Sequence, residues 1–280
     1  MKKLILLGIF VPSLLQAQRW HVNLFGGISN YSGDLQNKAF TLDQSNAAFG
    51  LGAQYDLTHH ISVLSNISLM KVGASDQFNK PSLQPRNLSF QTQIFEWNVL
   101  AEYTFVDIST HRFSPYVFAG AAVYHFNPFA FDSSGKKVYL HPLSTEGEGL
   151  PEYPGNKNYS LTQFAIPFGG GVKLRISDNV VLAYEIGFRK LFTDYLDDVS
   201  SNYVDGTILL NERGPKAVEM SYRGGELKNG DPTYPTAGTM RGSSKFKDIY
   251  YFTGIKISIA IISKSDSYYG RGRIDCPKMP

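Results

Sequence analysis

The 280-residue sequence has a single cysteine, Cys276, which excludes a framework of intramolecular disulfides. After residue 17, no apolar run reaches the ~18 residues of a membrane-spanning helix, so a helical inner-membrane protein is excluded. The net charge is small, because 27 Lys and Arg residues nearly balance 24 Asp and Glu residues. The electrostatic field of so small a net charge is too weak to attract a nucleic acid, which excludes nucleic acid as a partner. The histidines show no metal-ligand spacing, and the sequence predicts neither a metal nor a cofactor.

Residues 1–17 have the three parts of a secretory signal peptide. Lys2 and Lys3 form the positive start, the run LILLGIFVPSLL forms the apolar centre, and Ala17 is the small residue before the cut. Removing this segment lowers the formal charge from +3 to +1. The sequence therefore predicts export of a mature chain that begins at residue 18.

Aromatic residues make up 14% of the sequence, and many of them lie in segments where apolar and polar residues alternate. In the clearest segment, Phe95, Trp97 and Val99 alternate with Glu96 and Asn98. A period of two is expected of barrel strands whose side chains face lipid and lumen in turn. Eight such segments span residues 19–31, 47–57, 60–72, 90–105, 114–126, 159–176, 179–192 and 248–262.

The connections between these segments alternate in length. Those at 58–60, 106–113 and 177–179 are short, and those at about 74–87, 128–158 and 193–246 are long. Short periplasmic turns and long outer loops are typical of outer-membrane barrels, and aromatics spread at both strand ends favour a membrane barrel over a soluble sandwich. The predicted fold is all-β: an eight-stranded antiparallel transmembrane β-barrel over residues 18–263, in contact with outer-membrane lipids, with a periplasmic tail over 264–280.

The inward-facing positions of the predicted strands carry charges of both signs. The lumen of an eight-stranded barrel is only wide enough for side chains to fill it, and buried charges persist only when they are paired. The sequence therefore predicts a salt-bridged plug. Its members would be Glu96, Asn98, Glu102, Lys173, Arg175, Glu185, Arg189 and Lys256.

An acidic stretch follows the seventh segment, with Asp194, Asp197 and Asp198 among aromatics. Its spacing does not fit a calcium loop, in which oxygen ligands alternate. Spacings of three and four favour one turn of helix over a ligand site, with Asp194 as N-cap and the other two in the first turn. The expectation is a helical turn that covers the outer mouth of the barrel.

An enzyme in such a barrel would need a catalytic constellation near the outer leaflet, for example Ser, His and Glu. His125 is the histidine at a suitable height on the fifth segment, but no Ser or Glu companion is identifiable by spacing. The sequence predicts no catalytic residue.

The predicted tail, KSDSYYGRGRIDCPKMP, contains features that suit a partner. Cys276 has no second cysteine to pair with, so in an oxidising compartment it predicts an intermolecular disulfide or a reactive thiol. Arg271, Arg273 and Lys278 could complement an acidic surface, and a solvated basic tail is equally compatible with them.

Three stretches resemble the PorG family of the type IX protein secretion system: DYLDDVSSNYVD, FSPYVFAGAAVYHFNP and the tail motif CPKM. The resemblance implies a non-enzymatic outer-membrane component that anchors, on its periplasmic side, a ring made of a lipoprotein and its partner. Two other classes stay open: a barrel enzyme that modifies lipid A, and a stand-alone OmpA-like structural or adhesion barrel. A catalytic constellation at the outer rim would favour the enzyme, and a cysteine-dependent cross-link would favour the secretion component.

Overall fold

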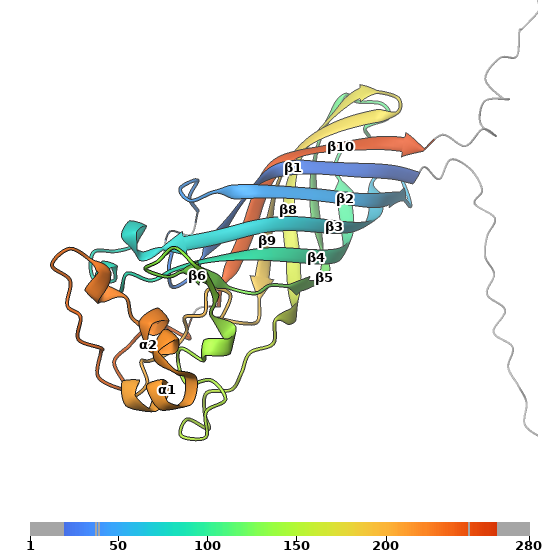
Figure 1. Cartoon of the computed structure of the whole chain (residues 1–280). Helices are drawn as coiled ribbons and strands as arrows, with labels where there is room; N and C mark the ends of the chain where they lie inside the picture. The colour runs from blue at the N-terminus through green and yellow to red at the C-terminus, as the bar shows by residue number, and fades with distance from the viewer. Residues whose placement is uncertain (1–19, 37, 39, 246, 262–280) are drawn as a thin grey trace, which may run out of the picture.

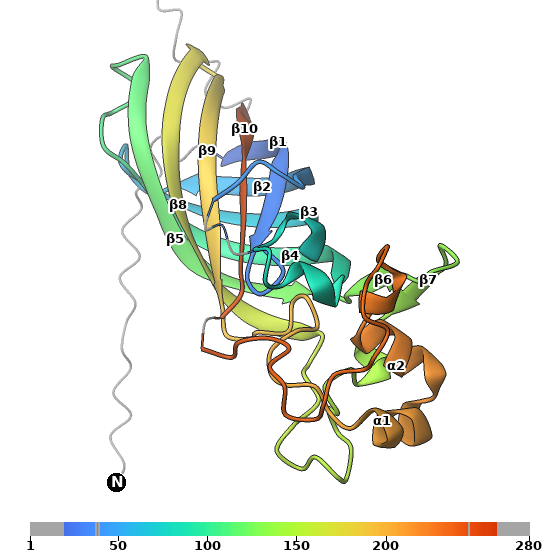
Figure 2. The same cartoon turned by 90° about the vertical axis from the view of Figure 1, so that its left-hand side faces the viewer.

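Eight long antiparallel strands close into a barrel in the computed structural model, which describes residues 20–36, 38, 40–245 and 247–261 (Figures 1 and 2). Each strand pairs with the next along the chain, and the last pairs with the first, so the barrel has no open edge. The predicted fold is confirmed, with every strand boundary within three residues of its expected place. The strands are β1 (Trp20–Ser32), β2 (Asn46–Asp56), β3 (Ile61–Ser75), β4 (Ser89–Thr104), β5 (Phe113–His125), β8 (Thr162–Ser177), β9 (Val180–Leu191) and β10 (Ile249–Ile261).

The outer face of the barrel is a belt of exposed apolar side chains. Leu51, Phe164 and Ile255 are 56%, 69% and 50% exposed, and their neighbours along each strand point inward and are buried or half-buried. None of the outward positions of the eight strands carries Asp or Glu. Such a belt matches the hydrocarbon layer of a membrane.

The two ends of the barrel differ. Short connections at 57–60, 105–112 and 178–179 lie at one end, and long connections at 33–45, 76–88, 126–161 and 192–248 lie at the other. Trp20 pairs with Ile261, so the described chain enters and leaves the barrel at the short-turn end (Figure 1). The predicted alternation of loop lengths is confirmed, and the long loops mark the outer end.

The four long connections fold together into what we call the outer cap (Figure 1). The cap contains the hairpin β6–β7, which is joined to β4 through the pair Gln91 and Phe129, and two short helices. Asp205 caps the first helix by accepting hydrogen bonds from the N–H groups of Thr207 and Ile208. None of the helices in the described ranges is long and apolar enough to cross a membrane. The elements are β6 (Phe129–Phe131), β7 (Lys137–Tyr139), α1 (Gly206–Arg213), α2 (Pro215–Ser221) and the 3₁₀ turns η1 (Asp76–Phe78), η2 (Gln84–Arg86), η3 (His141–Leu143) and η4 (Gly224–Glu226).

The cap and the outer half of the barrel share one hydrophobic core. Tyr124 and Tyr250 point into the lumen, and the core continues outward through Leu196, Val199 and Met220 of the cap. Several aromatics that an interface girdle would place against lipid are therefore inside the barrel: Tyr116, Phe118, Tyr124 and Phe126 of the fifth predicted segment are at most 5% exposed. Because the lumen is narrow, large rings fill it as effectively as they would anchor an interface.

Candidate functional site

A buried ion pair crosses the lumen between β4 and β9. The Arg189 guanidinium donates from Nε to Oε2 of Glu96 at 2.9 Å and from Nη2 to Oε1 at 2.8 Å. Tyr250 donates its hydroxyl to the same carboxylate at 2.5 Å, and Asn98 donates its amide at 2.7 Å. Glu96 and Arg189 are 0% and 1% exposed. Two parallel N–H···O bonds fix the pair in both distance and direction.

A second network lies nearer the short-turn end of the barrel. Glu102 accepts from Lys173 and, at 3.0 Å, from Lys256, and Lys256 also lies 3.0 Å from Glu185. Tyr116 donates its hydroxyl to Glu185 at 2.6 Å. Two lysines and two glutamates thus balance within the lumen, as buried charges require.

Arg175 does not join these networks, although it was expected in the plug. Its Nη1 donates to the carbonyl of Ser109 in the short turn 105–112, and the carboxylate of Asp178 is 3.8 Å away. Arg175 stands at the last inward position of β8 before the turn, where solvent and turn carbonyls compete for its guanidinium. The other seven expected members line the lumen. Five of them also line a cavity of about 30 Å³: Asn98, Glu102, Glu185, Arg189 and Lys256.

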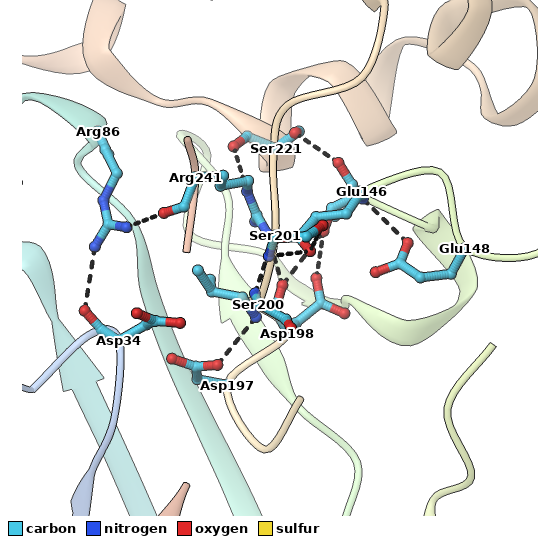
Figure 3. Close-up of polar contacts among 12 residues, drawn as sticks. Asp34, Arg86, Glu146, Glu148, Asp197, Asp198, Ser200, Ser201, Ser221 and Arg241 are labelled. Atoms are coloured by element: carbon cyan, nitrogen blue, oxygen red, sulfur yellow. Dashed lines mark hydrogen bonds and ion pairs between the residues drawn. The ribbon is translucent and has the colours of Figure 1, made fainter. Parts of the chain in front are cut away.

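In the cap, the carboxylate of Glu146 joins two of the long connections, 126–161 and 192–248 (Figure 3). It accepts hydrogen bonds from the N–H groups of Ser200 and Ser201 at 2.9 and 2.8 Å and from the Ser201 hydroxyl at 2.7 Å. Arg241 donates to it from Nη1 at 2.9 Å. Glu146 and Arg241 are 0% and 2% exposed. We call this arrangement the cap clasp.

A second arginine ties the clasp to the loop between β3 and β4. Arg86 forms a bidentate pair with Asp76, at 3.0 and 2.7 Å. The same guanidinium donates to the carbonyl of Arg241 and, at 3.3 Å, to the carbonyl of Asp34 (Figure 3). Segments that are far apart in sequence are therefore held together by charged side chains in a buried site.

The acidic stretch forms no helix, contrary to the expectation for Asp194, Asp197 and Asp198. Asp198 has a φ of 65°, which interrupts any helical turn, and none of the three carboxylates caps a helix. Each accepts instead from a side-chain hydroxyl: Asp194 from Ser200 at 2.9 Å, Asp197 from Tyr31 at 2.5 Å, and Asp198 from Thr145 and Tyr159, both at 2.6 Å. All three are at most 2% exposed. Tertiary partners overrode the local spacing.

Burial, together with an excess of carboxyl groups over cations around the clasp, raises the pKa of several carboxyl groups there. Burial and the charges of Asp198 and Glu146 raise the pKa of Glu148 to about 8. Burial raises the pKa of Asp194 to about 7, with a further contribution from Asp34. The pKa of Asp34 is raised to about 6, again chiefly by burial. One oxygen each of Asp194 and Glu148 is buried without a hydrogen-bond partner.

The stability of the cap should therefore fall as pH rises. A carboxyl whose pKa is raised on folding stabilises the folded state while it is protonated, and that contribution is lost as pH rises through the folded value, here from about 6 to about 8. We expect proteolysis of the cap to be about tenfold faster at about pH 8.5 than at about pH 5.5. Asp194→Asn, which stays neutral, should flatten this dependence. Faster cleavage at the lower pH would contradict the prediction.

Sequence reasoning missed the clasp itself. The signal that could have found it is the stretch TEGEGL at 145–150, in which glycines at φ 76° and 70° alternate with Glu146 and Glu148. Arg241 carries no comparable local signal, since nothing near it in sequence shows that it meets Glu146.

The remaining predicted residues lie apart from these networks or outside the structure. His125 is exposed, and its Nδ1 lies 2.9 Å from the Thr162 hydroxyl. Within the part of the chain that the structure describes, no group of three or more His, Cys, Asp or Glu is arranged to hold a metal ion. The predicted signal peptide at 1–17 and the predicted partner-binding residues Arg271, Arg273, Cys276 and Lys278 lie outside the described residues.

Residues 2–208 match a family model described as a domain of unknown function, DUF6089. The chain belongs to this family. The DUF6089 match extends from the predicted signal peptide through the first seven barrel strands and ends within α1. No curated protein matches the sequence.

Several solved structures resemble this member of the DUF6089 family in fold. Neisserial surface protein A is 10% identical, with 86% of this chain and 96% of that chain covered and a TM-score of 0.42. Ail, the attachment invasion locus protein of Yersinia pestis, solved with a heparin analogue, is 8% identical, with 88% and 100% covered and a TM-score of 0.40. OprG of Pseudomonas aeruginosa is 10% identical, with 87% and 94% covered and a TM-score of 0.37.

Proposed function

We propose that this chain is a non-enzymatic outer-membrane protein that anchors a partner and does not conduct solutes. The filled lumen carries this proposal. Two ion-pair networks cross it, and the cavity among them, about 30 Å³, has room for little more than a water molecule. A barrel without a channel acts through its two ends.

The surroundings of His125 support the non-enzymatic part of the proposal. A hydrolytic site of the Ser, His and acid type needs a carboxylate that orients the imidazole. Over the described residues, the contact of the His125 ring is with Thr162, and no carboxylate hydrogen-bonds to it or pairs with it. A lipid A-modifying enzyme is therefore the weaker alternative.

We further propose that the partner is the periplasmic ring of a type IX secretion system, formed by a lipoprotein and its own partner. The resemblance to the PorG family supports this, and so does the shape of the periplasmic end. Turns 57–60, 105–112 and 178–179 offer few side chains for a contact. The remaining candidate is the tail 264–280. An extended chain spans up to ~3.3–3.6 Å per residue, so a segment of this length could reach a ring.

Deleting residues 264–280 should leave a folded barrel that no longer co-purifies with the ring. In a non-reducing gel of membranes, the full chain should show a higher-mass band that Cys276→Ser removes, because Cys276 has no partner within the chain. An uncharged control in the same tail is Ser265→Ala, which leaves the cysteine in place and should keep the band. A tail-deleted protein that retains the ring and secretes cargo fully would contradict the anchor role. That result would favour a stand-alone structural or adhesion barrel, an alternative that the folded outer cap supports.

A further inference from the structure

A shallow, open hollow lies on the outside of the barrel, at the outer end of β8 and β9. It is lined by Ser160, Thr162, Gln163, Phe164 and Phe192. The two phenylalanines are 69% and 57% exposed. The hollow therefore combines an apolar floor with polar side chains at the edge toward the cap.

A lysine stands beside the hollow on the same outward face. Lys190 is exposed and pairs with Ile166 of β8 and Ile249 of β10. Phe164 lies two residues before Ile166, which makes it the diagonal neighbour of Lys190, about 7–8 Å away across the two strands. Lys247, also exposed, lies two residues before Ile249, the first residue of β10, and its Nζ donates to the carbonyl of Ser244 at 3.4 Å.

Among the described residues, no acidic side chain on the outward face neutralises the charge of Lys190. Two outward positions of the eight strands carry a cationic side chain, Lys71 and Lys190, and both lie at the outer end. None of the outward positions carries Asp or Glu. The nearest carboxyls along the chain, Asp194 and Asp248, are 2% and 0% exposed and belong to the cap interior. A phosphate at this height would meet an unpaired ammonium group.

We propose that this hollow binds an anionic, phosphorylated lipid of the outer leaflet. Its acyl chain lies on Phe164 and Phe192, and its phosphate accepts from Lys190, with Lys247 as a second cation. The proposal rests on the proposed outer-membrane location. It does not depend on the periplasmic anchor, because the hollow lies at the opposite end of the barrel from Ile261, where the described chain stops.

The test uses the full chain, purified in a neutral detergent, with diphosphorylated lipid A as the probe and the same lipid A after dephosphorylation as the comparison. Native mass spectrometry gives the two dissociation constants. The full chain should bind the phosphorylated form more tightly. Lys190→Gln should weaken that binding by about fivefold, the effect of one cation near an anionic lipid, and leave the dephosphorylated form unchanged. Phe192→Ser should weaken both.

Lys71→Gln is the matched control, since Lys71 is also a lysine at the outward face and outer end, opposite Gln93 and away from the hollow. It should leave both constants unchanged, and Lys190→Arg should retain binding. Heat-modifiable migration in gels verifies that each variant is folded. Equal losses in Lys71→Gln and Lys190→Gln, or equal binding of the two lipids by the full chain, would overturn the proposal while leaving the anchor function untouched.

Discussion

Replacing Arg189 with Met should lower the free energy of unfolding by about 3–5 kcal/mol, because the Glu96 carboxylate is left as an unpaired charge in the lumen. Tyr250 and Asn98 still donate to Glu96, but two neutral donors do not balance its charge. Urea unfolding in phospholipid vesicles, followed by the fluorescence of Trp20 and Trp97, measures the change.

Two variants separate charge from packing. In the double variant Glu96→Leu with Arg189→Met both charges are gone, so most of the stability should return, as it does when a buried ion pair is exchanged for apolar side chains of similar volume. Arg175→Met, the same substitution at the half-buried periplasmic rim, should cost less than about 1 kcal/mol. Equal losses at Arg189 and Arg175 would show that the lumen pair is solvated and that the plug is not dry.

Glu146→Gln should destabilise the cap by about 3–5 kcal/mol without opening the barrel. The substitution leaves Arg241 as a buried cation without a carboxylate, and it turns an amide N–H₂ toward the N–H donors of Ser200 or Ser201. Hydrogen exchange should therefore accelerate across 194–203 and 239–242, where the clasp holds the backbone. Heat-modifiable migration of the barrel should stay unchanged, since β1–β10 pairing does not involve Glu146.

Glu148→Gln is the matched control two residues away. The pKa of Glu148 is raised to about 8 by burial and by neighbouring carboxylates, so the carboxyl is already neutral at neutral pH and Gln preserves that state. We expect this variant to be neutral or slightly stabilising. A comparable loss from both substitutions would mean that Glu148 carries a charge that the clasp requires.

The clasp and the lumen plug form one continuous structure. Tyr250 donates to Glu96 in the lumen, and its ring lies 5.7 Å from that of Tyr124. Tyr31 reaches from β1 to Asp197 of the acidic stretch at 2.5 Å and to Asp248 at 3.0 Å. The cap is therefore fixed to the barrel by side chains as well as by the chain itself, which suits a protein that presents a rigid outer face.

The sequence by itself determined the barrel. Because side chains alternate with a period of two, the sequence of each strand decides which of them face lipid. Only a one-residue shift of register would turn Ile255 toward the lumen, or Glu96 toward lipid. Closure of eight strands makes the lumen narrow, so the inward charges of Glu102, Lys173 and Lys256 had to pair. Both conclusions follow from local alternation, which each strand carries within its own residues.

Only the tertiary structure decided the cap. Asp194, Asp197 and Asp198 have helix-like spacing, but hydroxyl partners from two other segments, and Ser200 of the same loop, were worth more than one turn of helix, which is marginal in isolation. Glu146 and Arg241 are 95 residues apart, and no periodicity links them. Loop conformations depend on such distant contacts, whereas the two faces of a strand are set by backbone geometry. For this reason the sequence predicted the barrel, but the arrangement of the cap could be seen only in the tertiary structure.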